Sequence, residues 1–249
     1  MKTRSILFPV LLLSAAVFSL TSCTDLVKKA AMKAIDETAE FEKEDTVKWG
    51  PVVEQDIELP SFSAIKAKGA VRVVFTQDSA LSVRIRGNEK CIADYKFIVK
   101  NDELKVGPKD FSGSVNKRTP AVTIFVTAPN LSEIAFYGAG RLDMPDAVVL
   151  PRSLEIELQG AGEVSIEDLT AEELGIQISG AGKCDIAKAT TAGNIEIEVN
   201  GAGEVNANVF CQELSVELNG AGNAVLSGEC KSFSCEQNGA SKIDTSNLN

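Results

Sequence analysis

The sequence of 249 residues contains no histidine. Its absence excludes serine–histidine and cysteine–histidine catalytic sites, two-histidine zinc sites and the commonest general base. Aromatic residues are scarce, with one tryptophan and two tyrosines, so few rings are present to stack against sugars. We therefore predict a protein that is not an enzyme, with no catalytic residues and no cofactor. A polysaccharide lyase or hydrolase that uses carboxylates is the alternative that this composition leaves open.

Positive charge is also in deficit, because 25 basic residues face 35 acidic ones and the net charge is −10. Such an acidic chain is not expected to bind nucleic acid. The six cysteines contain no Cys-x-x-Cys pair, which argues against a cysteine metal site. We assign no metal site from the sequence.

Only one long apolar run exists, and it lies at the amino end between Ile6 and Leu20, after Lys2 and Arg4. Its length and flanking residues predict a secretory signal peptide over residues 1–22 rather than a membrane span.

The end of this run, Leu20-Thr21-Ser22-Cys23, resembles the bacterial lipobox. The resemblance implies that Cys23 is lipidated and becomes the mature amino terminus; cleavage that leaves a free Cys23 is the alternative. Residues 23–50 are predicted to be a tether. We expect an exported protein, lipid-anchored at the cell envelope in the outer membrane, facing the periplasm or the cell surface.

The second half of the chain contains six copies of Gly-Ala-Gly or a near variant, at steps of 19–22 residues. We interpret each copy as a corner between two strands. The corner glycines are Gly138, Gly140, Gly160, Gly162, Gly180, Gly182, Gly201, Gly203, Gly220, Gly222 and Gly239. Apolar residues alternate with polar ones on both sides of each corner, which is the period of a strand with one buried face. A period of this length is typical of one turn of a stacked repeat. We predict an all-β, parallel β-helix-like solenoid over residues 131–249, with about 19–22 residues per turn.

Residues 51–130 are rich in strand patterns but lack the in-phase repeat. Gly69 and Ala70 form a degenerate copy of the corner motif. We predict that this segment forms the first turns and cap of the same body; a separate sandwich domain is the alternative. At the other end, residues 239–249 are predicted to be a fraying cap. Cys184 and Cys235 fall at inward positions and are predicted to be core residues.

Two outward rows follow from the same register. The residue before each corner is expected to form a ladder of hydrogen-bonded amides along the axis: Tyr137, Gln159, Ser179, Asn200, Asn219 and Asn238. The residue after each corner alternates in charge and is expected to fix the register: Arg141, Glu163, Lys183, Glu204, Asn223 and Lys242.

An acidic band lies on the outward positions before the corners. Its members are Glu133 and the six glutamates of the candidate cation or partner face, Glu155, Glu157, Glu196, Glu198, Glu217 and Glu236. Because stacked like charges repel, we expect this band to bind cations loosely or to face a basic partner. The alternative is a solvated face without a partner.

Cys211 and Cys230 lie nine residues before successive corners, so they are expected to be neighbours in adjacent turns. Their expected separation fits a disulfide, whereas parallel side-chain directions oppose one, and both alternatives stay open.

Three segments outside the corners carry a family resemblance: Phe62 to Gly69 leading into Val71-Arg72-Val73, Asn101 to Val106, and Pro129-Asn130-Leu131. With the corners, they resemble the auto-transporter adhesins with a head GIN domain, common among envelope lipoproteins of Bacteroidetes. The resemblance covers about residues 56–246. It implies a right-handed solenoid and a role in adhesion or scaffolding, and carries over no catalytic or binding residues.

We therefore expect a contact protein whose ligand is an unidentified protein or glycan. A cation-binding surface protein is another alternative. End-to-end self-association is expected where a terminal cap is incomplete, because the ends of a solenoid are unpaired strand edges.

Overall fold

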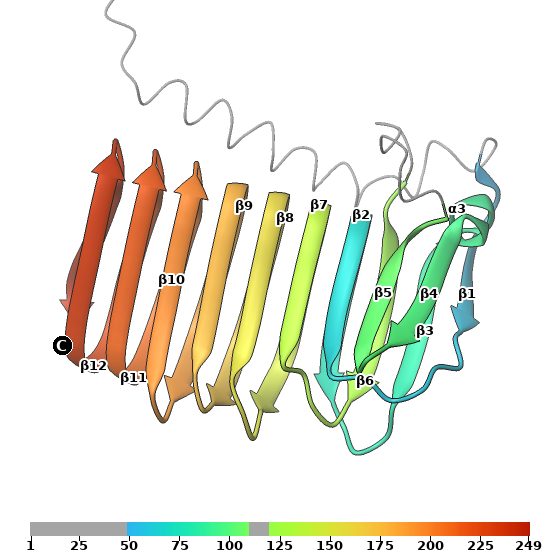
Figure 1. Cartoon of the computed structure of the whole chain (residues 1–249), viewed down its shortest axis with the longest axis horizontal. Helices are drawn as coiled ribbons and strands as arrows, with labels where there is room; N and C mark the ends of the chain where they lie inside the picture. The colour runs from blue at the N-terminus through green and yellow to red at the C-terminus, as the bar shows by residue number, and fades with distance from the viewer. Residues whose placement is uncertain (1–48, 110–119) are drawn as a thin grey trace, which may run out of the picture.

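The computed structural model describes residues 49–109 and 120–249. The predicted signal peptide, Cys23 and nearly all of the predicted tether lie outside the described residues. The described chain forms a β-solenoid of about six turns, shown in Figure 1. The predicted all-β solenoid class is confirmed.

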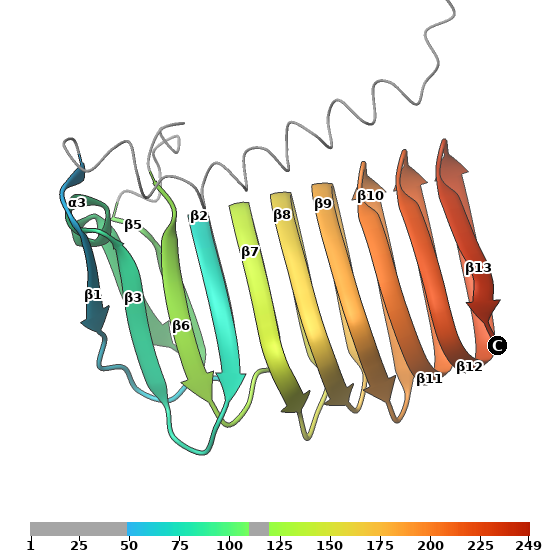
Figure 2. The ribbon, with the colours of Figure 1, turned by 180° about the vertical axis from the view of Figure 1, so that it is seen from behind.

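The regular turns are built from parallel strands of 7–18 residues that lie side by side along the axis (Figures 1 and 2). They are β7 (Glu133–Val149), β8 (Leu154–Ala171), β9 (Leu174–Thr191), β10 (Asn194–Gly201), β11 (Glu204–Gly220), β12 (Asn223–Gly239) and β13 (Lys242–Leu248). Their register runs from corner to corner, so Gly138 is opposite Gly160 and Gly160 is opposite Gly180. Equivalent residues of successive repeats therefore stack directly on one another.

The amino-terminal part joins the same sheet through different pairings. Its elements are β1 (Val52–Asp56), β2 (Ala64–Gln77), β3 (Ser82–Asn88), α3 (Glu89–Ala93), β4 (Tyr95–Lys100), β5 (Glu103–Pro108) and β6 (Val122–Ala128). Strand β2 pairs in parallel with β7 and places Gly69 opposite Gly138, so the degenerate corner at Gly69 stacks on the first regular corner. Strands β1 with β3, β3 with β6, and β4 with β5 pair antiparallel.

The core is a continuous stack of aliphatic layers. In β8, for example, Ile156 and Leu158 before the corner and Val164 and Ile166 after it are at most 2% exposed. Cys184 is fully buried, as predicted. This pattern follows from the alternation of the sequence, because every second side chain of each strand points into the stack.

The last turn differs from the sequence prediction in two ways. Cys235, predicted to be a core residue, is exposed because no described strand stacks on the outer side of its turn. The segment predicted to fray contains β13, which pairs with residues 223–228 of β12. Ile243 and Leu248 of β13 pack against the core, which gives this strand side-chain as well as backbone contacts.

The two glycines of each corner are required for different reasons. Gly180 has φ of +132°, and a Cβ there would overlap the carbonyl oxygen of Gly160 in the preceding turn. A Cβ at Gly182 would instead lie 2.8 Å from the side chain of Ile178 in its own turn. The first glycine thus allows the backbones to approach along the axis, and the second makes room for the core beneath the corner.

We predict that Gly180→Ala lowers the free energy of unfolding by about 2–3 kcal/mol, because alanine is strained at this φ and meets backbone. The midpoint of urea unfolding measures the effect. Ala181→Ser, at the centre of the same corner, is the control and is expected to unfold near the wild-type midpoint. Equal midpoints for the two variants would contradict this account of the corner.

Candidate functional site: the acidic face

The strands that precede the corners present three outward rows, which together we call the acidic face. The first row is Glu133, Glu155, Gly175, Glu196, Ser215 and Ser234. The second is Glu157, Gln177, Glu198, Glu217 and Glu236, and it begins at Ala135, which is buried. The third is Tyr137, Gln159, Ser179, Asn200, Asn219 and Asn238. The six glutamates predicted as a partner face therefore divide between two neighbouring rows.

The third row contains the amide ladder. The Nδ2 atom of Asn219 donates to Oδ1 of Asn200 at 3.0 Å, and Nδ2 of Asn238 donates to Oδ1 of Asn219 at 2.9 Å. These bonds confirm the ladder in the last three turns.

The same amides also donate sideways, to the second row. Nδ2 of Asn238 bonds Oε1 of Glu236 at 3.0 Å, and Asn219 bonds Glu217 in the same way. Each amide thus directs one hydrogen along the axis and the other to the glutamate two residues earlier. The second-row carboxylates are acceptors in one network with the ladder, which disperses their charge.

From the sequence we predict the amide row and the acidic row as two separate features. The signal that joins them is the spacing Glu-x-Asn, present at Glu198, Glu217 and Glu236. Residues two apart on a strand point to the same side, so an amide lies next to the preceding carboxylate.

The first row lacks such donors around Glu155. A Cβ on Gly175 would overlap the Glu155 carboxylate, so this side chain lies over the glycine between Glu155 and Glu196. Although Glu155 is exposed, partial desolvation raises its pKa, and the negative charges of Glu196, Glu133 and Glu173 raise it further. Glu133, at the amino-terminal end of the first row, is paired with Lys66 at 3.2 Å, so the uncompensated charge of this row lies at Glu155 and its neighbour Glu196.

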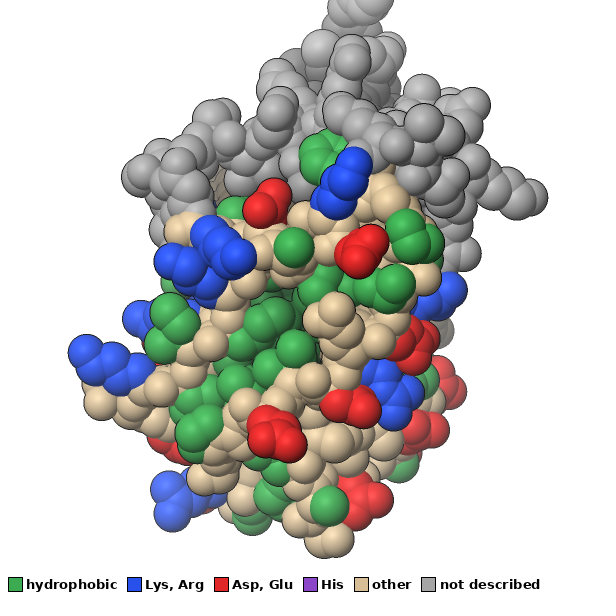
Figure 3. All heavy atoms as spheres, turned by 90° about the vertical axis from the view of Figure 1, so that its right-hand side faces the viewer, with side chains coloured by type: hydrophobic (Ala, Val, Ile, Leu, Met, Phe, Trp, Pro, Cys, Tyr) green, Lys and Arg blue, Asp and Glu red, His purple; other side chains and the backbone are tan. Residues whose placement is uncertain are grey.

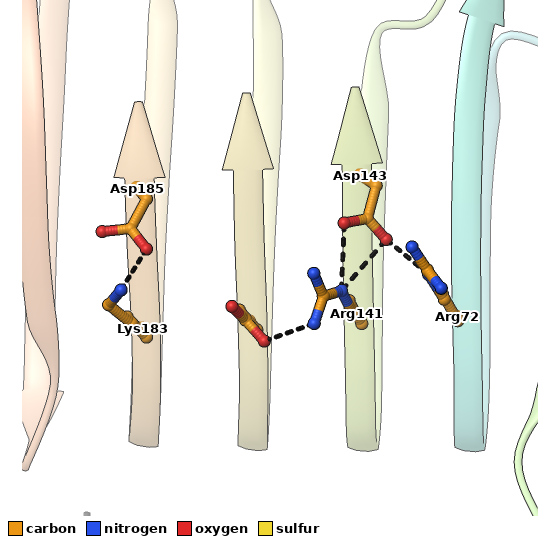
Figure 4. Close-up of polar contacts among 6 residues, drawn as sticks. Arg72, Arg141, Asp143, Lys183 and Asp185 are labelled. Carbon is orange, nitrogen blue, oxygen red and sulfur yellow. Dashed lines mark hydrogen bonds and ion pairs between the residues drawn. The ribbon is translucent and has the colours of Figure 1, made fainter. Parts of the chain in front are cut away.

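A charged row follows the corners on the adjoining side of the solenoid (Figure 4). Arg141 Nη1 bonds Glu163 Oε2 in the next turn at 2.8 Å, as the alternation of charge predicted. Asp143 Oδ2 accepts from Arg72 Nε in the preceding turn at 2.6 Å, and Asp143 Oδ1 from Arg141 Nε at 3.0 Å. Three turns are thereby linked through charged side chains.

Farther along this row, the direct partner of Lys183 is Asp185 of its own turn. Asp185 Oδ1 also accepts from Asn206 Nδ2 of the next turn at 2.8 Å. The predicted alternation is present in the stacking, because Lys183 lies between Glu163 and Glu204. Its direct ion pair is with the acid two residues farther along its own strand; this pair raises the pKa of Lys183, and both glutamates raise it further.

Cys211 and Cys230 are opposite one another in β11 and β12, as predicted, and both are half-buried free thiols. Burial raises the pKa of the Cys211 thiol to about 11, and Cys230 contributes to the rise. The two thiols are not joined by a disulfide in this structure.

Within residues 49–109 and 120–249, no cluster of three or more acidic, cysteine or histidine side chains is placed to hold a metal ion. In the same part of the chain, no helix combines the length and the apolar character needed to cross a bilayer. Cation binding by the acidic face stays a prediction.

A family model described as "Putative auto-transporter adhesin, head GIN domain" matches residues 61–191 and again residues 176–249. The chain belongs to this family. The two overlapping matches extend over the irregular amino-terminal strands as well as the regular turns of the head GIN domain. No curated protein is significantly similar to the chain in sequence.

Solved structures share the fold of this head GIN domain. A "putative adhesin" from Bacteroides fragilis is 22% identical, covers 78% of this chain and 96% of its own, and has a TM-score of 0.58. A second "putative adhesin", from Parabacteroides distasonis, is 13% identical with the same coverages and a TM-score of 0.53.

The amide ladder of the head GIN domain generates one prediction. Asn219→Ala removes bonds to two turns and to Glu217, and we expect it to lower the free energy of unfolding by about 1–3 kcal/mol. Asn238→Ala, at the exposed end of the ladder, is the matched control and is expected to cost less. Urea unfolding of both variants tests this, and a loss at Asn219 no larger than the loss at Asn238 would contradict the stabilisation expected from bonds to both neighbouring turns.

The first row generates a second prediction, on pH. Because the pKa of Glu155 is raised in the folded state, protonation of this carboxylate stabilises the folded state. The gain in stability is complete at pH values below the ordinary glutamate pKa, and it is lost as the pH rises through the folded-state pKa. Glu155→Gln imitates the protonated form, so we expect it to be more stable than wild type at pH 7.

The advantage of Glu155→Gln should disappear below a pH of about 4, where wild-type Glu155 is also neutral. Thermal unfolding from acid to neutral pH measures it. Glu167→Gln removes an exposed charge from another side of the turn and serves as the control. A Glu155→Gln variant that is less stable than wild type at pH 7 would contradict the repulsion in the first row.

Proposed function

We propose that this chain is a non-enzymatic, lipid-anchored envelope protein whose function is adhesion through the acidic face. The observation that carries the proposal is the in-register repetition of one outward surface over successive turns. Membership of an adhesin family supports it. A scaffold within an envelope complex would use the same surface with a partner in the same membrane.

The chemistry of the acidic face favours a partner with a basic protein surface. Second-row carboxylates such as Glu198 and Glu217 are half-buried and already bonded by amides, which holds them in fixed positions. First-row carboxylates such as Glu155 and Glu196 are exposed and repel one another. A partner that brings lysine or arginine to this face relieves that repulsion, and the fixed second row gives the approach a defined spacing.

The anchor is proposed from the lipobox at Cys23, which lies outside the described residues. Three acyl chains on this cysteine would hold the protein at a membrane far more firmly than one chain does. The mass of the amino-terminal peptide, isolated from cells that make the protein, tests the anchor independently of binding.

The adhesion proposal is tested with the full-length acylated protein in vesicles, bound to immobilised polylysine and to a glycan panel. The test variant changes Glu157, Glu198, Glu217 and Glu236 to glutamine, which keeps an acceptor for the amides. The control variant neutralises the same number of exposed acids on other sides of the turn: Asp146, Glu167, Glu172 and Glu229.

We expect the test variant to bind polylysine at least tenfold more weakly than the control variant at low salt. Added salt should weaken the binding of the test variant less than that of the control variant. Equal weakening by both variants would assign the binding to net charge rather than to the acidic face. Glycan binding that neither variant changes would assign the contact to another surface.

A further inference from the structure

The carboxyl-terminal end of the solenoid is an open strand edge. The last turn consists of residues 232–239 of β12 followed by β13, and no described strand pairs with its outer side. All residues from 231 to 240 are exposed, including the inward-facing Phe233, which is 37% exposed. An apolar layer and a backbone edge are thus uncovered at the same place.

The register shows which backbone groups face outward at this edge. Leu154 N–H donates to Glu173 in the following turn, and Glu155 N–H donates to Ser132 in the preceding turn. Phe233 occupies the Leu154 position of its turn. The backbone N–H and C=O groups of successive residues point to alternate sides of a strand. Those of Phe233, Cys235 and Gln237 therefore face the open edge.

The opposite end of the solenoid is closed in a different way. That end has two edge strands. Strand β1 has only five residues and carries Glu54 and Asp56, both paired with Arg84 of β3. Strand β4 has six residues, pairs with β5 alone among the described strands, and carries Lys96 and Lys100. Figure 3 shows charged side chains around the apolar surface of that end. Short edge strands with charges discourage pairing with other chains, whereas the inward positions of the last turn carry no charge and no proline.

We propose that residues 232–239 pair antiparallel with the same residues of a second copy, in a two-fold dimer centred on Cys235. An isologous contact of this kind uses one patch on both subunits and closes on itself. The column of strands that ends in residues 232–239 continues through β2 and β5 to β4 at the opposite end, so a head-to-tail filament would have to pair this edge with β4, which carries Lys96 and Lys100. Both apolar layers would meet at the dimer centre and cover each other.

The outward side chains fit this register. Ser234 falls opposite Glu236 of the partner subunit, and Ser232 falls opposite Asn238 of the partner subunit, so hydroxyl donors meet acceptor oxygens. Asn238 Oδ1 is the acceptor end of the ladder, and the structure describes no donor for it. Pairing centred one residue later would place two Glu236 carboxylates opposite each other, where like charges repel.

The test measures the mass of the full-length acylated protein in detergent by light scattering, for wild type and three variants. Cys235→Pro removes an N–H that faces the open edge but none that bonds β11, so the solenoid should fold without the dimer. Phe233→Lys places a charge at the interface and is a second disruptor. Cys235→Ser is the matched control.

We expect dimers for wild type and Cys235→Ser, and at least tenfold weaker dimerisation for Cys235→Pro and Phe233→Lys with unchanged circular dichroism. A monomeric wild type, or disruptor variants that dimerise as wild type does, would overturn the proposal. Dimers that are lost only when the amino-terminal segment is removed would also overturn it.

The register has its own test. Copper(II) phenanthroline with oxygen takes two electrons from two Cys235 thiols, whose protons are released as the S–S bond forms. The dimer should become covalent in the Cys211→Ser variant and not in the Cys235→Ser variant. A covalent dimer that persists without Cys235 would overturn this register.

Discussion

The parallel register between successive turns is the constraint on which the rest of the structure depends. It is set at the corners, where glycine at positions such as Gly180 lets one backbone lie against the carbonyl of the turn before it. Once the corners are aligned, every residue stacks on its equivalent in the next repeat. Aliphatic residues of successive turns then form a continuous core, and amides form a ladder. Glutamates of successive turns also become neighbours along the axis. The chemistry of the outer surface is therefore a consequence of the stacking rather than an independent feature.

Stacking also explains why the two ends of the molecule differ from its middle. A single turn buries too few side chains to offset the entropy lost on ordering its backbone, so each turn depends on its neighbours. At the amino-terminal end, antiparallel strands and α3 terminate the stack. At the other end the last turn keeps the form of an internal one, including its ladder asparagine, and leaves Phe233 and Cys235 exposed.

The sequence was sufficient to predict the corners, the strands and the buried positions, because periodic glycine and alternating aliphatic residues determine both backbone and burial. It was not sufficient for contacts that depend on where flexible side chains lie, such as Lys183 with Asp185 or Glu155 over Gly175. The exposure of Cys235 depends on whether another turn follows, which local alternation does not reveal. The amino-terminal strand order β1-β3-β6-β2 joins segments far apart in the sequence and carries no periodic signal.

A surface of this kind is suited to contact with another macromolecule, since its charges are repeated along the axis and partly fixed by the ladder. Adhesion requires that this surface face the exterior of the cell. The most direct measurement is protease shaving of intact cells that make the protein, followed by mass spectrometry of the released peptides. The account predicts release of peptides from the solenoid with the cells intact. Complete protection of the solenoid, while a known surface protein is cleaved, would contradict adhesion and leave a periplasmic scaffold.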